Sequence, residues 1–337
     1  MALISKKITI GCDIGAHSIK WAEVQQKGSE YRLLSFYEKP LPHNAIVNGK
    51  IRDFAAVAKS LKEIVKKSKK PKKICISIQG SQVVTKKIQV PSFTREESTP
   101  CIEWEIEQYI PFDKEGVYLD YYKLGDSHVV FVAAEKNLVD TYTQFLTDLE
   151  TPVDTVETNC MALEKIWKTN YPEDFDKTAA IISLGASYSE LSIFQNHHLH
   201  WNYPIFSNGS TLTHMIQKKL KLTFEEAENL KQGAQDKAPK EIDDVIFEYL
   251  DEMGEEVLKA LKTFISFEPS VSLDKIYITG GVSKMGDLVS RLSEKCGFQL
   301  IPLEIFKNIK KHKKLNIKSL NSVEKQAAIA VGLALRT

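Results

Sequence analysis

Two stretches far apart in the chain carry glycine in the same setting, one that suits binding of a phosphate. Residues 10–20 read IGCDIGAHSIK and residues 180–190 read AIISLGASYSE, so Gly15 aligns with Gly185. Each copy predicts an apolar strand, a tight Gly-Ala turn and a second apolar strand. In such a turn the backbone N–H groups can approach an anion without interference from a Cβ atom. One glycine turn alone is more often a simple hairpin turn, but the pair predicts two hairpins that hold a polyphosphate between them.

Two further segments could complete a nucleotide site. Residues 277–284 (YITGGVSK) again run from a strand into a glycine pair, where the backbone could pass close to a base or a phosphate. Glycine turns at the carboxyl ends of strands lie where open α/β sheets bind their ligands. In residues 225–231 (EEAENLK), Glu228 and Lys231 share one helix face and could hydrogen-bond ribose hydroxyls. Without the turns, that pair would be an ordinary surface ion pair.

The composition excludes several classes of protein. The 337 residues include 45 Lys and Arg and 44 Asp and Glu, a net charge of +1, which gives no general attraction to nucleic acid or to an anionic membrane. The five cysteines are widely spaced without a C-x-x-C pair, which argues against a disulfide framework and a zinc site. No apolar run approaches the roughly 18 residues of a membrane span, and the first residues do not read as a signal peptide. We therefore expect a cytoplasmic protein.

Strands that alternate with helices predict an α/β fold in which helices cover the sheets. The pattern divides the chain into a first subdomain (1–80 and 151–176, with a C-terminal helix at 323–336 packing back on it), an inserted module (81–150), a second subdomain (177–209 and 271–322) and a helical subdomain (210–270). The inserted module reads as β-α-β-β-α. Its first helix has two candidate starts, either Thr94 with Glu97 as a capping box or Thr99 as N-cap followed by Pro100.

Several motifs together resemble a known family. They are DIGAHSIKWAEV from Asp13, IQVP (88–91), EWEIEQYIPF (103–112), LDYY (119–122), VAAEK (132–136), GGVSKMGDL (280–288) and VGLALR (331–336). The glycine turns resemble those of the actin-like ATPase superfamily. The segment at 103–112 is the most specific, and it resembles the type IV pilus assembly PilM family, whose members are relatives of the cell-division protein FtsA. The similarity covers nearly the whole chain in the right order.

The resemblance implies an actin-like (ribonuclease H-like) duplicated fold with an FtsA-type inserted subdomain. It also implies ATP or ADP with Mg²⁺ in an interdomain cleft, with Asp13 holding the metal through water. The turns and the resemblance together place these residues at the nucleotide: Asp13, Gly15, Ala16, His17, Ser18, Lys20, Ser183, Gly185, Ala186, Ser187, Gly209, Ser210, Glu228, Lys231, Gly280, Gly281, Val282 and Lys284.

The resemblance further implies a scaffold at the cytoplasmic side of the inner membrane. It would hold the N-terminal cytoplasmic peptide of the membrane protein PilN, communicate with the pilus inner-membrane complex and its motor ATPases, and reach the membrane only through these partners; self-association is compatible with it. The inserted module contains none of the glycine turns, so we expect the peptide there, near Val83, Ile88, Trp104, Tyr109 and Phe112. For Trp104, Tyr109 or Phe112 alone, a place in the module's own core is the simpler interpretation.

The sequence departs from the family pattern at two positions. Ser183 stands where family members commonly carry an acidic residue, and a hydroxyl is a weaker, neutral substitute for a carboxylate that would hold a metal through water. Asn208 stands in residues 207–213 (SNGSTLT) where glycine is expected. We therefore expect weak or absent hydrolysis and name no catalytic residue. The alternatives are an active ATPase or small-molecule kinase of the superfamily and an FtsA-like filament former. His197, His198 and His200 predict a hairpin surface rather than a metal site.

Overall fold

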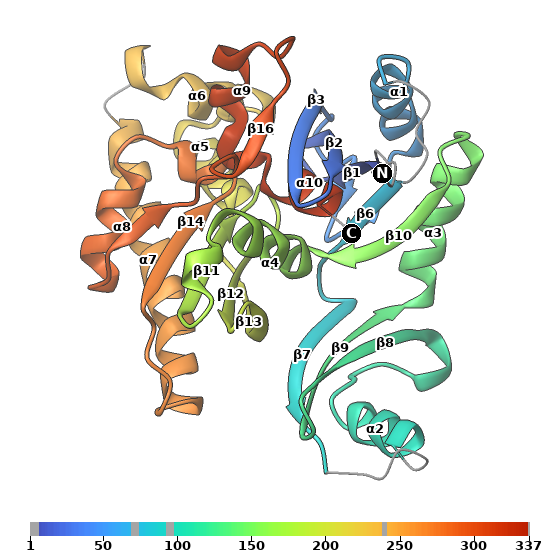
Figure 1. The fold of residues 1–337 in the computed structure, drawn as a ribbon. Helices are drawn as coiled ribbons and strands as arrows, with labels where there is room; N and C mark the ends of the chain where they lie inside the picture. The colour runs from blue at the N-terminus through green and yellow to red at the C-terminus, as the bar shows by residue number, and fades with distance from the viewer. Residues whose placement is uncertain (1–6, 69–73, 92–97, 238–240, 336–337) are drawn as a thin grey trace.

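The computed structural model describes residues 7–68, 74–91, 98–237 and 241–335, which form two halves, each built around one sheet (Figure 1). The sheet of the first half has the strand order β10-β6-β1-β2-β3-β16. In it, β1 pairs antiparallel with β2 and parallel with β6. Its strands are β1 (Lys7–Ile14), β2 (Ser18–Lys27), β3 (Glu30–Pro40), β6 (Ile74–Ile78), β10 (Val153–Thr158) and β16 (Ile309–Lys311).

The sheet of the second half repeats this arrangement, with the order β13-β12-β11-β14-β15. Here β11 pairs antiparallel with β12 and parallel with β14, so it occupies the place that β1 has in the first sheet. The predicted duplication is therefore present in the topology. The strands are β11 (Thr178–Leu184), β12 (Ser189–Gln195), β13 (His198–Ile205), β14 (Lys275–Thr279) and β15 (Leu300–Pro302).

Helices cover the outer faces of both sheets. In the first half, apolar side chains of α1 and α3 join one buried cluster with β1 and β6. Asp53 caps α1 as predicted, and its side chain accepts the Ala56 N–H. In the second half, four helices contribute to the cluster under β11 and β12. The bounds are α1 (Phe54–Val65), α3 (Lys136–Asp148), α5 (Gly209–Leu220), α6 (Phe224–Lys237), α7 (Glu241–Phe267) and α8 (Leu288–Cys296), and the short strands β4 (Ile46–Val47) and β5 (Lys50–Ile51) precede α1.

Two helices, α4 (Asn159–Asn170) and α10 (Ala328–Ala334), lie between the halves (Figure 1). Backbone contacts bring α10 very close to its neighbours. A Cβ atom on Gly332 would lie 2.2 Å from the Ala162 carbonyl oxygen of α4, and one on Gly11 of β1 would lie 1.9 Å from the Ala330 carbonyl oxygen. Only glycine fits at either contact.

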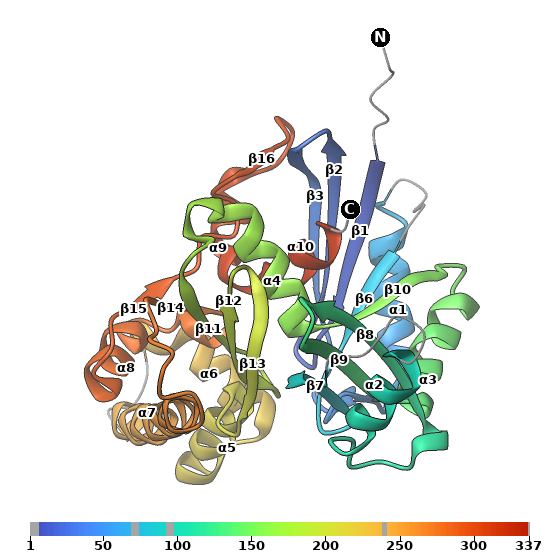
Figure 2. The same ribbon diagram turned by 60° about the horizontal axis from the view of Figure 1, so that its bottom comes forward.

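The inserted module lies below the first half in Figure 1 and comes forward in Figure 2. It has a hydrophobic core of its own. Its sheet has the order β7-β9-β8, and α2 packs on it through Ile102 and Ile106. The elements follow the predicted β-α-β-β-α order. They are β7 (Val83–Gln89), α2 (Ser98–Glu107), η1 (Lys114–Gly116), β8 (Val117–Leu124), β9 (His128–Glu135) and α3.

The structure differs from the predicted boundaries in three places. β16 lies within the segment assigned to the second subdomain, yet it pairs with β3 in the first sheet. The predicted C-terminal helix at 323–336 begins at the last residue of α9 (Ile317–Val323) and is divided into η4 (Glu324–Gln326) and α10. Helix α2 already includes Ser98, so Thr99 is not its N-cap, and Thr94 lies outside the described residues. None of the helices in the described ranges combines the length and apolar character that crossing a bilayer requires.

The contact between α10 and α4 predicts a large effect of a single methyl group. Replacing Gly332 by Ala places Cβ 2.2 Å from the Ala162 carbonyl oxygen, so the helices must separate. We expect the free energy of unfolding to fall by at least about 2 kcal/mol, as in other overpacked cores. Gly116→Ala is the control, because no atom lies within 4 Å of the added Cβ there. Denaturant unfolding measures both variants, and equal midpoints would contradict the packing described.

Candidate functional site

The first glycine turn has a charged pair at its base. Gly15 donates its N–H to the Ser18 carbonyl at 3.2 Å and so closes the turn between β1 and β2. Directly opposite each other on these strands, Asp13 and Lys20 form an ion pair of 3.1 Å, and each side chain is 12% exposed. A carboxylate and an ammonium group therefore lie together where the turn begins.

The second turn is held by the start of α5. The N–H groups of Gly209 and Ser210 donate to the carbonyls of Gly185 and Ala186, at 3.0 and 2.7 Å. Asn208, the residue found in place of the expected glycine, is the N-cap of α5. Both Gly209 and Ser210 were predicted at the nucleotide, but these backbone donors are already engaged, so they position the turn.

Each turn retains two adjacent N–H groups without a protein acceptor. They belong to Ala16 and His17 in the first turn and to Ala186 and Ser187 in the second, and within the described residues none of them donates a hydrogen bond. Consecutive free N–H groups at a glycine turn form a concave site for an anion. This arrangement fits the predicted phosphate contacts.

A network on α5 and α6 joins the two turns. Lys231 lies 2.6 Å from Glu228 and donates to the Gly209 carbonyl at 3.1 Å, while the Thr213 hydroxyl donates to Glu228 at 2.6 Å. On its other side, Glu228 Oε1 lies 3.8 Å from His17 Nδ1. The predicted pair is thus no isolated surface ion pair, since it contacts His17 of the first turn and the start of α5, which holds the second turn.

Burial sets the charge states in this network. It lowers the pKa of His17 below its ordinary value, so the imidazole is neutral at pH 7 and its contact with Glu228 is not an ion pair. Burial also lowers the pKa of Lys231, although the neighbouring carboxylate opposes this. Burial of Glu228 acts to raise its pKa, but the Lys231 ammonium and hydrogen bonds outweigh it and hold the pKa below the ordinary range.

The third turn lies against the second. Gly280 has φ +97°, and a Cβ atom there would lie 2.3 Å from the Leu184 carbonyl oxygen, so this position requires glycine. Its N–H donates to the Lys325 carbonyl at 2.8 Å. A Cβ atom on Gly209 would lie 3.0 Å from Val282 Cγ2. The third turn, the second turn and the start of α5 are therefore packed together, and Lys284 beyond them is exposed.

Glu38 and Gln326 complete the connection to the first turn. Gln326 donates to Glu38 Oε2 at 2.6 Å, and Ser18 donates to Glu38 Oε1 at 2.8 Å. Gln326 also lies beside Gly281, because a Cβ atom on Gly281 would be 3.7 Å from Gln326 Oε1. Together with the network on α5 and α6, these contacts connect four motifs in a closed circuit, which we call the turn ring. It consists of the first turn at Gly15, the second turn at Gly185, the third turn at Gly280 and Gly281, and the Glu228–Lys231 pair.

The sequence analysis missed several members of the turn ring and its surroundings. Glu38 and Gln326 contact the predicted residues but belong to no recognisable motif, and Thr213 ends the segment 207–213 but was not itself predicted at the site. His43 was also missed; its ring stacks on Phe224 with a centroid distance of 3.4 Å and so joins the first half to α6. No local sequence pattern could have indicated these partners.

Glu190 is a further residue that the sequence analysis did not single out. It lies directly opposite Ser183 on β12, in the register position that Lys20 has opposite Asp13. Its side chain is 2% exposed, and burial raises its pKa from 4.5 to about 7. The alignment of the two hairpins already places Glu190 over Lys20, but only the structure shows its burial.

The predicted partner residues separate into buried and exposed groups. Ile88 is 4% exposed and belongs to the module's own core, which Phe112 also contacts, whereas Val83 packs against the core of the first half. In contrast, Trp104 is 60% exposed and Tyr109 is 41% exposed. Of the predicted partner residues, only these two therefore present large aromatic surfaces to a partner.

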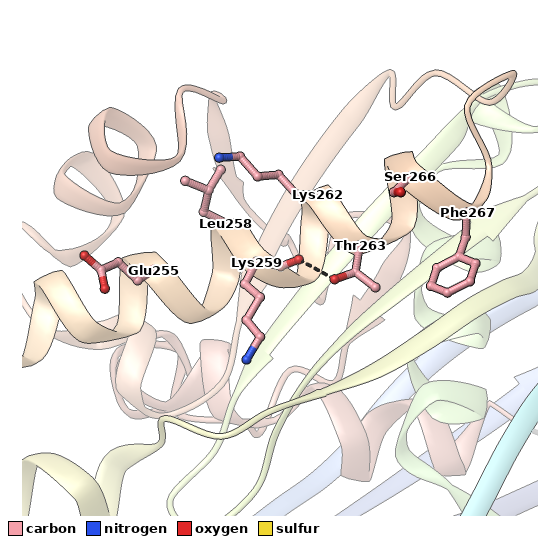
Figure 3. Close-up of a pocket in the computed structure, with 7 residues that line it drawn as sticks. All are labelled: Glu255, Leu258, Lys259, Lys262, Thr263, Ser266 and Phe267. Atoms are coloured by element: carbon pink, nitrogen blue, oxygen red, sulfur yellow. Dashed lines mark hydrogen bonds between the residues drawn. The ribbon is translucent and has the colours of Figure 1, made fainter.

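Two other features of the described residues do not belong to the turn ring: a depression on α7 and the histidines between positions 197 and 200. A shallow depression of about 470 Å³ follows the outer face of α7, and its lining residues, from Glu255 to Phe267, all come from this one helix (Figure 3). The expected histidine surface is wrong for His197, which is buried and packs edge-on against Trp167. His200 lies 3.0 Å from Lys87 of β7. In the described residues, no group of three or more His, Cys, Asp or Glu could hold a metal ion.

Comparison with known proteins adds a family and a fold. The family model described as type IV pilus assembly protein PilM matches residues 11–337. A solved structure described as a PilM-PilN type IV pilus biogenesis complex has a TM-score of 0.87 and 24% identity, over 97% of this chain and 98% of that chain.

Two more distant structures share the fold. Ethanolamine utilization protein EutJ from Carboxydothermus hydrogenoformans has a TM-score of 0.59 and 12% identity, over 98% of this chain and 89% of that chain. MreB5 of Spiroplasma citri bound to ADP has a TM-score of 0.51 and 11% identity, over 97% of this chain and 94% of that chain. The expected actin-like fold is confirmed.

The raised pKa of Glu190 predicts how stability depends on pH. Because the folded protein binds this proton more tightly than the unfolded chain, stability is lost as pH rises from 4.5 to about 7. At about 1.4 kcal/mol for each pKa unit, the loss is on the order of 3 kcal/mol. Glu190→Gln should therefore raise the free energy of unfolding at pH 8 and have little effect at pH 4.5. Denaturant unfolding at both pH values measures this, and a pH-independent difference would contradict it.

Proposed function

The chain belongs to the type IV pilus assembly protein PilM family, and from this premise we propose that it is a nucleotide-binding scaffold of the pilus machinery. It binds ATP or ADP with Mg²⁺ at the turn ring and holds the N-terminal cytoplasmic peptide of PilN on the inserted module. It works at the cytoplasmic face of the inner membrane, which it reaches through its partners.

One observation carries the nucleotide proposal. Each of two opposed turns offers two adjacent free N–H groups, and Lys20 lies at the base of one of them. Oriented backbone N–H groups and a nearby ammonium group are what phosphates require. MreB5, which shares the fold, has been solved bound to ADP, and this is consistent with nucleotide binding by this chain.

The remaining ring residues fit the other parts of the ligand. Lys20 and the two turns would hold the phosphates, Asp13 would hold Mg²⁺ through water, and the third turn would border the base. Glu228 Oε1, which faces His17 rather than Lys231, would accept a ribose hydroxyl. The metal would neutralise phosphate charge and orient the phosphates.

We propose that turnover is slow or absent. Ser183 is 9% exposed and contributes only a neutral hydroxyl at the place where Asp13 of the first turn contributes a carboxylate. A hydroxyl attracts a metal-bound water less strongly than an anion does. This difference favours a binding protein over a fast ATPase or a small-molecule kinase.

The nucleotide site is tested by filling the space beside the third turn. Gly281 is exposed, and within 4 Å a Cβ atom there would meet only Gln326 Oε1, so the backbone at this position accepts a side chain. Gly281→Trp should weaken ADP binding at least about tenfold, a loss of about 1.4 kcal/mol. Fluorescence anisotropy with labelled ADP and Mg²⁺ measures the affinity.

Gly116→Trp is the matched control for this substitution. It introduces the same side chain in the inserted module, where no atom lies within 4 Å of the added Cβ. It should bind ADP like the wild type. Wild-type affinity in Gly281→Trp would place the nucleotide elsewhere.

The peptide proposal rests on the exposed aromatic pair of the module. Trp104 of α2 and Tyr109 just beyond α2 were both predicted to contact a partner, and both aromatic side chains are exposed. The ammonium group of Lys86 of β7 lies 4.3 Å from the centroid of the Tyr109 ring. Exposed aromatic side chains beside a strand suit an extended peptide, whose apolar residues they can cover. The related PilM-PilN complex supports PilN as the partner.

A PilN N-terminal peptide should protect amides of β7 and α2 from hydrogen exchange. Trp104→Ala should weaken its binding by at least about tenfold, because truncation of a central aromatic side chain commonly removes that much affinity. Phe247→Ala on α7 is the control, since Phe247 is 45% exposed and its ring lies against Arg291 of α8 in the second half. Protection confined to α7 would overturn this placement.

A further inference from the structure

The two hairpins of the turn ring differ in where they place their acid. In the first hairpin, Asp13 of β1 lies opposite Lys20 of β2; in the second, Ser183 of β11 lies opposite Glu190 of β12. Residues directly opposite in an antiparallel pair share a face of the sheet, with Cβ atoms about 5 Å apart. The second hairpin therefore has a carboxylate on the same face as Ser183, contributed by the neighbouring strand.

Glu190 lacks the partners that a buried carboxylate normally has. Its Oε1 is buried and has no hydrogen-bond partner among the described residues. The other oxygen, Oε2, has the side-chain amide of Asn202 at 3.3 Å when the amide nitrogen is turned toward it. A buried acid with neither a cation nor full hydrogen bonding destabilises the fold, so its presence calls for a compensating role.

The surroundings of Glu190 place it near the second turn and the start of α4. Burial is the largest cause that raises the pKa of Cys160, and the charge of Glu190 is the next. The same order of causes applies to the pKa of Tyr188. Cys160 lies in the first turn of α4, which follows β10 of the first sheet, and Tyr188 belongs to the second glycine turn. Glu190 thus lies near both the second glycine turn and the start of α4, the helix between the two halves.

We propose that Glu190 is the second carboxylate of the Mg²⁺–nucleotide site, in place of the acid that is absent at Ser183. This inference rests on the proposed nucleotide binding. Mg²⁺ retains several waters in proteins and is held by one or two carboxylates, often through those waters. The unpaired Oε1 of Glu190 is an acceptor for such a water. Asp13 serves the metal from the first half, and Glu190 serves it from the second.

The test separates binding of the metal from binding of the nucleotide. Isothermal titration gives the ADP affinity with saturating Mg²⁺ and again with EDTA, and the ratio of the two is the gain due to Mg²⁺. In Glu190→Gln this gain should fall about tenfold or more, as for other residues that support metal ligands. The affinity in EDTA should not fall, because the substitution removes only a negative charge.

Glu23→Gln is the matched control. Glu23 is a buried carboxylate on β2, 8% exposed, that accepts hydrogen bonds from Trp21 and Ser68, away from the turn ring. This variant should keep the full gain due to Mg²⁺. The double variant Ser183→Asp/Glu190→Gln moves the acid across the strand pair, and it should recover most of the gain.

The outcomes distinguish this inference from the proposed function. Suppose that the wild type binds ADP. If Glu190→Gln then keeps the full gain in affinity due to Mg²⁺, or if the double variant recovers none of it, the role of Glu190 is overturned and nucleotide binding stands. A wild type that binds no ADP in either condition overturns both. Melting curves of each variant, recorded alongside, show that the proteins are folded.

Discussion

The geometry of the site depends on the close packing of α10 between β1 and α4. This helix has only seven residues, too few to be stable alone, and its position comes from backbone contacts that glycine permits at Gly11 and Gly332. The residues directly before it, Lys325 and Gln326, are thereby fixed between the third turn and Glu38. The absence of a side chain at Gly11 of β1 allows α10 to approach, and this approach helps to place the contact between Gln326 and Glu38 in the turn ring.

The two halves share a backbone plan but differ in their electrostatics. In the first hairpin, the carboxylate of Asp13 is balanced by Lys20 within the strand pair. In the second hairpin, Glu190 has no such cation, and burial raises its pKa to about 7. A group that lowers stability while it lies beside a candidate site is typical of functional positions, where stability is exchanged for activity. The duplicated fold thus has one internally neutralised turn and one that retains an unpaired acid.

The inserted module contacts both halves of the protein. Tyr142 of α3 donates to the Gly49 carbonyl of the first half at 2.9 Å, and Lys87 of β7 lies 3.0 Å from His200 of the second half. A rotation of one half against the other would change these contacts together. Hinged closure around a ligand is a common motion of two-domain proteins. The module is therefore in direct contact with both halves of the protein.

The sequence by itself determined the local elements and the pairing of the hairpins. Strand alternation, the glycine turns, the Asp53 cap and the order of the inserted module all depend on residues within one or two elements, and such short-range patterns are readable. The motifs at 103–112 and elsewhere indicated the family through residue types and their order along the chain. The residues proposed to bind the nucleotide could be named for the same reason, because most of them lie in or beside the turns.

Only the tertiary structure decided which of these residues meet, and which are covered. Gln326 reaches Glu38, and β16 joins the sheet of β3, across most of the chain length. The unpaired state of Glu190 and the exposure of Trp104 beside the buried Ile88 likewise depend on neighbours from other elements. Hydrophobic periodicity shows which face of an element is apolar, but it carries no information on what packs against that face. Contacts between distant segments depend on how whole elements pack, and that is fixed only when the chain is folded.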